Sequence, residues 1–97
     1  MVRLISDKMT HIVKRRGHKQ VFDDRKLYAS VYAACLSSHT QKEESEATAD
    51  LVTREIKKWL GDKEEVGSGD LFKQVGEELK RLNKEAAFMY LTHRDVS

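Results

Sequence analysis

The sequence contains a single cysteine and no proline. Because Cys35 has no partner in the chain, it cannot form an internal disulfide, nor can the chain build a zinc site from four cysteines or from two cysteines and two histidines. Such a chain suits a reducing compartment, so we expect a cytoplasmic protein. The absence of proline favours a helix-rich fold with few rigid turns. No apolar run reaches the roughly 18–20 residues of a membrane-spanning helix, so we expect no membrane partner.

Several short motifs that mark enzymes are also missing. The sequence has no glycine-rich phosphate loop of the G-x-x-x-x-G-K-[ST] type, no G-x-G-x-x-G, no G-x-S-x-G and no C-x-x-C. Its four histidines, at positions 11, 18, 39 and 93, do not show the i, i+4 spacing of paired metal ligands on a helix. We therefore predict no catalytic residues and no metal site, which means that the protein is not an enzyme.

The charged residues are distributed unevenly along the chain. The 97 residues carry a net charge of +2, yet residues 1–40 hold eight Lys/Arg against three Asp/Glu, and residues 41–97 hold ten against thirteen. The first segment is thus net +5 and the second net −3. A length of 97 residues predicts one domain. A basic end on such a domain is a candidate for binding phosphate groups.

Residues 11–22 predict a β-hairpin. His11–Arg15 and Lys19–Phe22 are short runs that contain β-branched residues, and Gly17 between them can adopt the positive φ of a tight turn. "EEV" at residues 64–66 predicts a third short strand. Residues 1–10 show no clear period, so we expect a tail or an extra strand there, followed by one domain over residues 11–97.

The spacing of apolar residues predicts four helices. The first begins at Asp23 or Asp24, whose carboxylate can cap it, and it ends near Ser37. The second follows a capping box formed by Thr40 and Glu43, and it ends at Gly61. The expected buried stripes of these two helices are Leu27, Val31, Ala34 and Cys35, and Val52, Ile56, Trp59 and Leu60.

The third helix is expected to begin at Ser68 as its N-cap, and the fourth spans residues 84–94. Their expected apolar stripes are Leu71, Val75, Leu79 and Leu82, and Ala87, Met89, Tyr90 and Leu91. Gly76 inside the third helix costs roughly 1 kcal/mol relative to alanine, which suggests close packing at that position. Strands grouped at one end and helices elsewhere predict an α+β fold, mostly α.

Six cations lie within thirteen residues, and they form the most distinctive cluster of the chain: Lys14, Arg15, Arg16, Lys19, Arg25 and Lys26. Lys26 falls in the first turn of the first helix, where a cation is unfavourable unless an anion compensates it. From the residues alone, three interpretations stay open: a solvated hairpin, a site for a nucleoside triphosphate, and a nucleic-acid surface. Tyr28 and Tyr32, one helical turn apart, can either stack on bases or pack against the core.

The stretch "IVKRRGHKQVFDDRKLYASV" resembles the opening of the ATP-cone family, whose pattern is near V-x-K-R-[DN]-G-x-x-[EQ]-x-[FY]-[DN]-x-x-K-[IL]-x-x-[SA]-[IV]. "EEVGSGDLFKQVGEEL" resembles the second element of the family and "NKEAAFMYLTHR" its closing helix, so the resemblance covers about residues 11–94. It implies a four-helix bundle capped by a small β-hairpin or three-stranded sheet, with ATP or dATP bound beneath the cap, together with Mg²⁺. Such domains are allosteric sensors attached to ribonucleotide reductases and to their transcriptional repressor.

The resemblance also implies which residues bind the nucleotide. Lys14, Arg15 and Lys26 would meet the phosphates, and Ser68 would contribute near them. The remaining expected site residues are Ile12 at the base, Gln20 at the base or sugar, and Asp23 at a position that is often Asp or Asn.

Three positions depart from the family pattern. Arg16 replaces the usual Asp or Asn before the glycine, Phe72 stands where some members carry a polar residue such as His, and Tyr90 stands where Arg is frequent. These departures bear on nucleotide selectivity. Gln20, Arg16 and Phe72 also leave open a degenerate cone that has become a protein-interaction domain.

Neither a zinc ribbon nor a reductase barrel accompanies the domain in this sequence, so we expect a free-standing cone or a fragment of a longer chain. A lone cone would act by binding a partner protein or by changing its oligomeric state. A nucleic-acid-binding module built on the basic hairpin ranks behind a nucleotide sensor.

Overall fold

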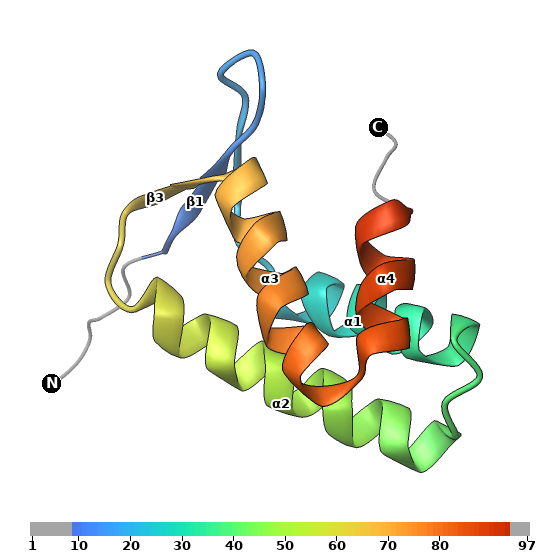
Figure 1. The fold of residues 1–97 in the computed structure, drawn as a ribbon. Coiled ribbons are helices and arrows are strands. Elements are labelled where there is room, and N and C mark those ends of the chain that lie inside the picture. Colours follow the sequence, from blue (N-terminus) through green and yellow to red (C-terminus); the bar gives the residue numbers. More distant parts are fainter. Residues whose placement is uncertain (1–8, 94–97) are drawn as a thin grey trace, which may run out of the picture.

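The computed structural model describes residues 9–93, in which three strands and four helices follow one another along the chain (Figure 1). Their order is β1 (His11–Val13), β2 (Lys19–Val21), α1 (Asp24–Ser37), α2 (Lys42–Leu60), β3 (Glu65–Gly67), α3 (Ser68–Leu82) and α4 (Lys84–Thr92). The predicted α+β class, mostly α, is confirmed. Most of the tail expected over residues 1–10 lies outside the described residues.

The strands form one sheet in the order β2-β1-β3, in which β1 pairs antiparallel with β2 and parallel with β3. We call this sheet and its turn at residues 14–18 the β-cap. Ile12 pairs with Gln20 on one side and with Val66 on the other, and both Ile12 and Val66 are buried against the helices. The expected positive φ of Gly17 is confirmed at 81°. Arg16 also has a positive φ, of 79°, which is costly for a residue with a Cβ.

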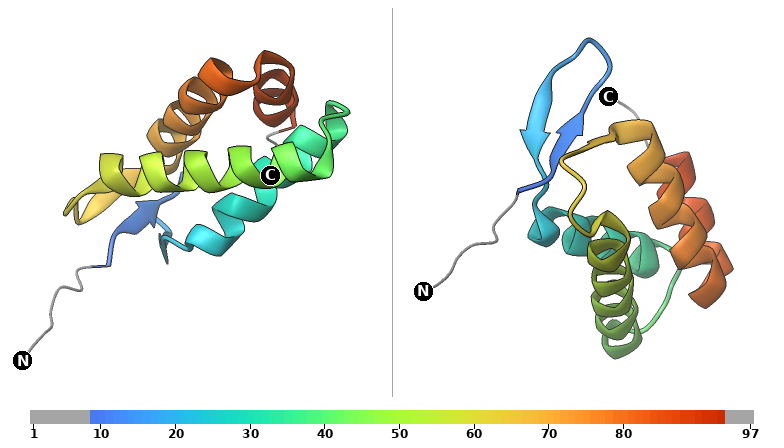
Figure 2. Two further views of the ribbon diagram at one scale, coloured as in Figure 1. Left: turned by 90° about the horizontal axis from the view of Figure 1, so that it is seen from below. Right: turned by 90° about the vertical axis from the view of Figure 1, so that its left-hand side faces the viewer.

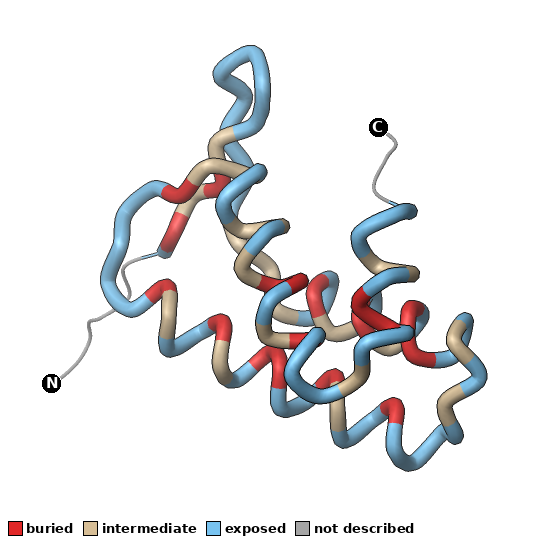
Figure 3. Tube along the Cα trace, in the orientation of Figure 1, coloured by how far each residue is buried: buried red, intermediate tan, exposed pale blue. Residues whose placement is uncertain are grey.

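The four helices form a layer that we call the helical base. The turn of the β-cap projects beyond it, which the right-hand view of Figure 2 shows clearly. Buried positions lie mainly along the inner sides of the helices, whereas the turn is exposed throughout (Figure 3). The stripe predicted for α1 is buried as expected, and Asp23 caps this helix by accepting a hydrogen bond from the backbone N–H of Arg25.

The expected close packing at Gly76 is confirmed. This glycine is buried on α3, and a Cβ built there would lie 2.7 Å from a terminal carbon of Leu91 on α4. The missing side chain therefore lets α3 and α4 approach each other. Asn83 joins the two helices, and its side chain caps α4 by accepting from the backbone N–H of Ala86.

The predicted capping box at the start of α2 is wrong. Gln41 holds the N-cap position and makes no side-chain capping bond. The Thr40 hydroxyl instead hydrogen-bonds the Ser38 hydroxyl at 3.0 Å and accepts from the Asn83 side-chain amide at 2.8 Å. The Thr40 hydroxyl is therefore used in a contact between the α1–α2 loop and the α3–α4 junction, and it does not cap α2 as the local spacing predicted.

Two further details of α3 differ from expectation. Ser68 is not its N-cap: Gly67 holds that position, because β3 runs directly into the helix and Ser68 is already the first helical residue. Leu82 was expected in the buried stripe, but it is 47% exposed because α3 ends there. Val75 and Leu79 are buried as predicted.

Candidate functional site

A cleft of about 1160 Å³ separates the β-cap turn from the start of α3. One wall is formed by residues 13–16 of the hairpin, and the other is formed by residues 67–72 at the β3–α3 junction. Tyr90 of α4 completes the lining. The site thus combines a turn rich in cations with the N-terminus of a helix.

Three cations of the turn form no ion pair with any residue that the structure describes. They are Lys14, Arg15 and Arg16, and all three are exposed. By contrast, Lys19 pairs with Glu65 at 2.6 Å, and this hydrogen bond lowers the pKa of the Glu65 carboxyl. The positive charge of the turn therefore lies at the cleft, where it attracts anions.

The opposite wall is suited to an anion for an independent reason. Gly67 at the N-cap of α3 makes no side-chain capping bond, so no side chain satisfies the free N–H groups of the first turn from that position. The positive end of the helix dipole lies at the same place. A Cβ added at Gly69 would meet nothing within 4 Å, so the backbone there is open to a ligand. Phosphate oxygens are the groups that commonly bind such helix termini.

The expected site residues are only partly brought together. Lys14, Arg15 and Ser68 line the cleft from its two walls. The sequence reasoning did not assign Asp70, which adds a carboxylate to the lining from the first turn of α3. The signal available in the sequence was the acidic residue two positions after Ser68.

The other four expected residues do not line this cleft. Ile12 is only 7% exposed and packs into the core beneath the β-cap. Gln20 pairs with it across the hairpin and is exposed. Asp23 serves as the cap of α1, and Lys26 is exposed in the first turn of that helix.

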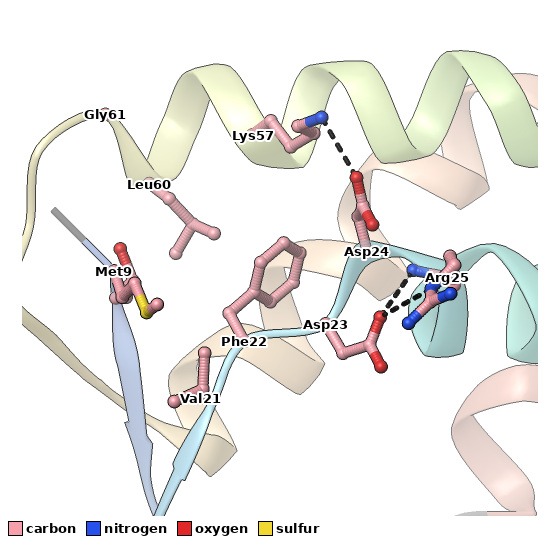
Figure 4. Close-up of a pocket in the computed structure, with 10 residues that line it drawn as sticks. Met9, Val21, Phe22, Asp23, Asp24, Arg25, Lys57, Leu60 and Gly61 are labelled. Carbon is pink, nitrogen blue, oxygen red and sulfur yellow. Dashed lines mark hydrogen bonds and ion pairs between the residues drawn. The ribbon is translucent and has the colours of Figure 1, made fainter. Parts of the chain in front are cut away.

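A second pocket, of about 560 Å³, lies where β2 enters α1, beside the end of α2 (Figure 4). Phe22 and Leu60 form part of its apolar wall. Its charges are paired internally: the Lys57 ammonium lies 3.0 Å from the Asp24 carboxylate, and this hydrogen bond lowers the pKa of Asp24. Because the charges already compensate each other, this pocket lacks the attraction for anions of the larger cleft.

The two tyrosines considered for base stacking stack on each other instead. The rings of Tyr28 and Tyr32 are 6.3 Å apart between centroids, and both are partly buried against the core. Burial, the largest cause, also raises the pKa of the Tyr28 hydroxyl. Both residues are therefore packing residues of the helical base.

The part of the chain that the structure describes holds neither a candidate metal site nor a candidate membrane span. No three His, Cys, Asp or Glu side chains between residues 9 and 93 are grouped so that they could hold a metal ion. None of the helices in that range combines the length and the apolar character of a membrane span.

Comparison with known proteins places these features in a family. A family model described as the ATP cone domain matches residues 10–96. The chain is 30% identical over 97 residues to the transcriptional repressor NrdR of Carboxydothermus hydrogenoformans, with 96% of this chain and 62% of that protein covered. It is 28% identical over 96 residues to NrdR of Sorangium cellulosum, with 95% and 61% covered. The chain thus matches less than two thirds of the length of these curated relatives.

The family model matches nearly the whole chain, and the structure shows the small sheet above helices that the resemblance implied. The turn glycine of the motif has the positive φ that it needs, and the two basic residues at the start of the motif line the cleft. The chain belongs to the ATP cone domain family.

Proposed function

We propose that this ATP cone binds ATP or dATP in the cleft between the β-cap turn and α3, and that it acts as a nucleotide sensor without catalytic activity. One observation carries the proposal: three cations that form no ion pair within residues 9–93 line the same cleft as the first turn of α3, whose N-cap residue makes no side-chain capping bond. The family membership supports nucleotide-sensing regulation in general. The choice of nucleotide and of partner belongs to the proposal.

Lys14 and Arg15 are the phosphate-binding residues of the proposal on the hairpin side, and Ser68 is the one on the helix side. A charge-assisted hydrogen bond contributes roughly 1.5–3 kcal/mol. Three such bonds and an enclosed base can reach about −8 kcal/mol, which corresponds to a micromolar dissociation constant. The roles expected for Ile12 and Gln20 stay predictions, as do those of Asp23 and Lys26.

Asp70 bears on the expected Mg²⁺. A carboxylate beside a triphosphate is repulsive unless a cation lies between them. Mg²⁺ is commonly held by one or two carboxylates together with substrate phosphates. Asp70 lines the same cleft as the phosphate-binding residues, so it is the side chain that would face a Mg²⁺ carried by the nucleotide.

A sensor must present different surfaces in its two nucleotide states, because a ligand shifts an equilibrium only through its different affinity for the two states. The β-cap turn is the region to which we assign this change. It is exposed and lies on one wall of the cleft, so a nucleotide that bridges the turn and α3 would reposition it. The readout is either a partner protein or a second copy of the chain.

Nucleic acid is the second candidate ligand. All residues from Lys14 to Lys19 are exposed, the turn projects beyond the helices (Figure 1), and both matched relatives are named transcriptional repressors. Phosphate contacts from this turn would give an affinity that falls steeply with the logarithm of salt concentration. A flat salt response, or no binding at low salt, would remove this candidate.

The test is a calorimetric titration of the full chain with ATP and with dATP in Mg²⁺, with an oligonucleotide titrated separately. Micromolar binding is expected for ATP or dATP. Lys14→Ala should weaken it at least about tenfold, the value of one lost charge-assisted bond. Lys42→Ala is the matched control, because Lys42 is also exposed and is absent from the ion pairs of residues 9–93. A folded protein that binds no nucleotide would overturn the proposal and leave a protein-interaction domain.

A further inference from the structure

The pocket where β2 enters α1 has apolar side chains that the described residues leave partly uncovered. Met9 is 59% exposed and Val21 is 46% exposed, and both line this pocket of about 560 Å³. Phe22 and Leu60 line it as well, and Figure 4 shows the four side chains around the same space. Apolar side chains that gather around one pocket, unlike single exposed ones, mark a surface that binds another group.

The walls of this pocket come from both regions of the fold. Met9 and Thr10 directly precede β1, and Val21 ends β2, whereas Leu60 and Gly61 lie at the end of α2 in the helical base. A segment that occupies the pocket would therefore contact the β-cap and the helical base at the same time.

The occupant is suggested by the residues that precede Met9 in the chain. Residues 1–8 lie outside the described residues, and the sequence joins them to the rim of the pocket at Met9. They contain three apolar side chains within four positions, at Val2, Leu4 and Ile5. The next two residues are serine and aspartate, which favour a turn. An apolar stretch followed by a turn-forming pair thus stands immediately before the pocket.

The spacing lets this apolar stretch reach the pocket. Ile5 precedes Met9 by four positions and Leu4 precedes it by five. A chain spans at most about 3.3–3.6 Å per residue, so these two side chains can lie anywhere within about 13–18 Å of Met9. Attachment to the rim also gives the stretch a high effective concentration at the pocket.

A second pocket includes Met9 but has a charged lining. Its volume is about 420 Å³, and its other lining residues are His11, Lys19, Glu64 and Glu65. The Lys19 ammonium and the Glu65 carboxylate form an ion pair at 2.6 Å there. Apolar side chains gain free energy against apolar surface, whereas covering charged groups costs free energy. The pocket beside α2 is therefore the favoured position for the apolar stretch.

We propose that residues 2–5 fold back into the pocket between β2 and the end of α2, where they strap the β-cap to the helical base. Leu4 and Ile5 supply the buried side chains. The proposal gives the tail or extra strand expected over residues 1–10 a definite surface to bind. It does not depend on nucleotide binding, because the linings of this pocket and of the cleft share no residue.

Cysteine cross-linking in the full chain tests this position. Leu4→Cys is combined with Val21→Cys in one variant and with Glu64→Cys in the other, because Val21 and Glu64 line different pockets that both include Met9. The native Cys35 is 0% exposed, so it does not react. Each rate of disulfide formation is divided by the rate at which the Val21→Cys or Glu64→Cys thiol alone reacts with glutathione disulfide.

The Val21 variant should form its disulfide within one chain at least about tenfold faster than the Glu64 variant, because burying one leucine side chain shifts an equilibrium by about that factor. Equal normalised rates, or a faster Glu64 variant, would overturn the proposal. Disulfides that join two copies in place of one would also overturn it, and they would make a second copy the occupant of the pocket.

A double-mutant cycle tests the same contact without cysteines. Leu4→Ser should lower the folding equilibrium constant at least about fivefold, measured by denaturant unfolding, whereas the control Lys8→Ser should change it less than about twofold. When Val21→Ser is already present, Leu4→Ser should have a smaller effect, because the contact is then already weakened. No effect of Leu4→Ser, or an equal effect in both backgrounds, would overturn the proposal.

Discussion

The helical base and the β-cap differ in how far they bury their side chains. Within residues 9–93, the side chains given as 0% exposed all belong to helices: Val31, Cys35, Ser45, Ala49, Val52, Ile56, Val75, Leu79 and Ala86. In the β-cap the best-buried residues, Ile12 and Val66, are each 7% exposed, and residues 14–21 are all exposed. The base thus holds the packing that stabilises the domain, and the cap holds the charges that can meet a ligand.

The β-cap is nevertheless tied to the base at one end. The Thr10 hydroxyl donates to the backbone carbonyl of Lys63 at 2.7 Å, and β3 pairs with β1 before it runs into α3. Its strands have three residues each, so they have few ladder bonds of their own. A region with few buried apolar contacts opens locally at low free-energy cost, which is a property that a ligand-responsive element needs.

The largest expected effect comes from the base. Ile56→Ala removes a fully buried side chain in the middle of the core, and we expect a loss of about 2–5 kcal/mol in the free energy of unfolding because a cavity remains. Denaturant unfolding followed through Trp59, the single tryptophan, measures it. Nucleotide affinity of the folded fraction should stay within about twofold. A large loss of affinity would show that a change in the core of the helical base alters the nucleotide site at the β-cap, so that the two regions are not energetically independent.

The sequence predicted the base better than the cap, for a physical reason. The helices have long apolar periods, and the stripe Leu27–Val31–Ala34–Cys35 of α1 is buried as expected. The hairpin and its turn glycine could also be predicted, because positive φ is a local requirement. Close packing at Gly76 could be predicted from a glycine inside a helix. The sequence did not indicate that the residue packed there is Leu91 of α4.

What the sequence could not predict depends on contacts between distant segments. The Thr40 hydroxyl bonds to Asn83, which lies 43 positions away, and so it does not cap α2. The parallel pairing of β3 with β1 brings Ser68 and Asp70 to the cleft opposite the turn. The stacking of Phe72 of α3 on Tyr90 of α4 depends on how the two helices pack together, and no local pattern predicts it.

A smaller effect is expected in the cap, with the opposite sign. Arg16 has a φ of 79°, a region that Asn tolerates better than other residues with a side chain, and Asn is one of the residues that the family pattern has there. Arg16→Asn should therefore raise the free energy of unfolding by up to about 1 kcal/mol. Thermal unfolding measures it, with Lys73→Asn as the control in a helical backbone, because Lys73 of α3 is exposed and forms no ion pair within residues 9–93.

Nucleotide titration of the same variant completes the comparison. Arg16 lines the cleft, so Arg16→Asn should also weaken ATP binding although the chain becomes more stable. Weaker ATP binding together with higher stability would show that Arg16 contributes to ligand binding at a cost to the stability of the folded chain. A variant that is destabilised would contradict the role of backbone strain at this turn.

The smallest expected effect lies where cap and base meet, at the Lys57–Asp24 pair between α2 and α1. Both side chains are largely exposed, so Asp24→Asn should cost less than about 1 kcal/mol. The pH dependence of this stability difference tests whether the ion pair is its source. Because the hydrogen bond from Lys57 lowers the pKa of folded Asp24 below its ordinary 3.8, the contribution is complete above 3.8 and disappears as the pH falls through the folded value.

Stability measured by denaturant across this pH range should therefore show the unmodified chain and Asp24→Asn converging in acid and separated by a constant amount above 3.8. Asp62→Asn is the control, since Asp62 is exposed and takes part in no ion pair within the described chain. When Lys57→Ala is already present, adding Asp24→Asn should cost less stability than it does in the unmodified chain, because the ion pair is then already broken. The remaining cost comes from Arg25 and the N-terminus of α1, which still favour the charged carboxylate. An equal cost in both backgrounds would show that the Lys57–Asp24 pair contributes nothing to stability.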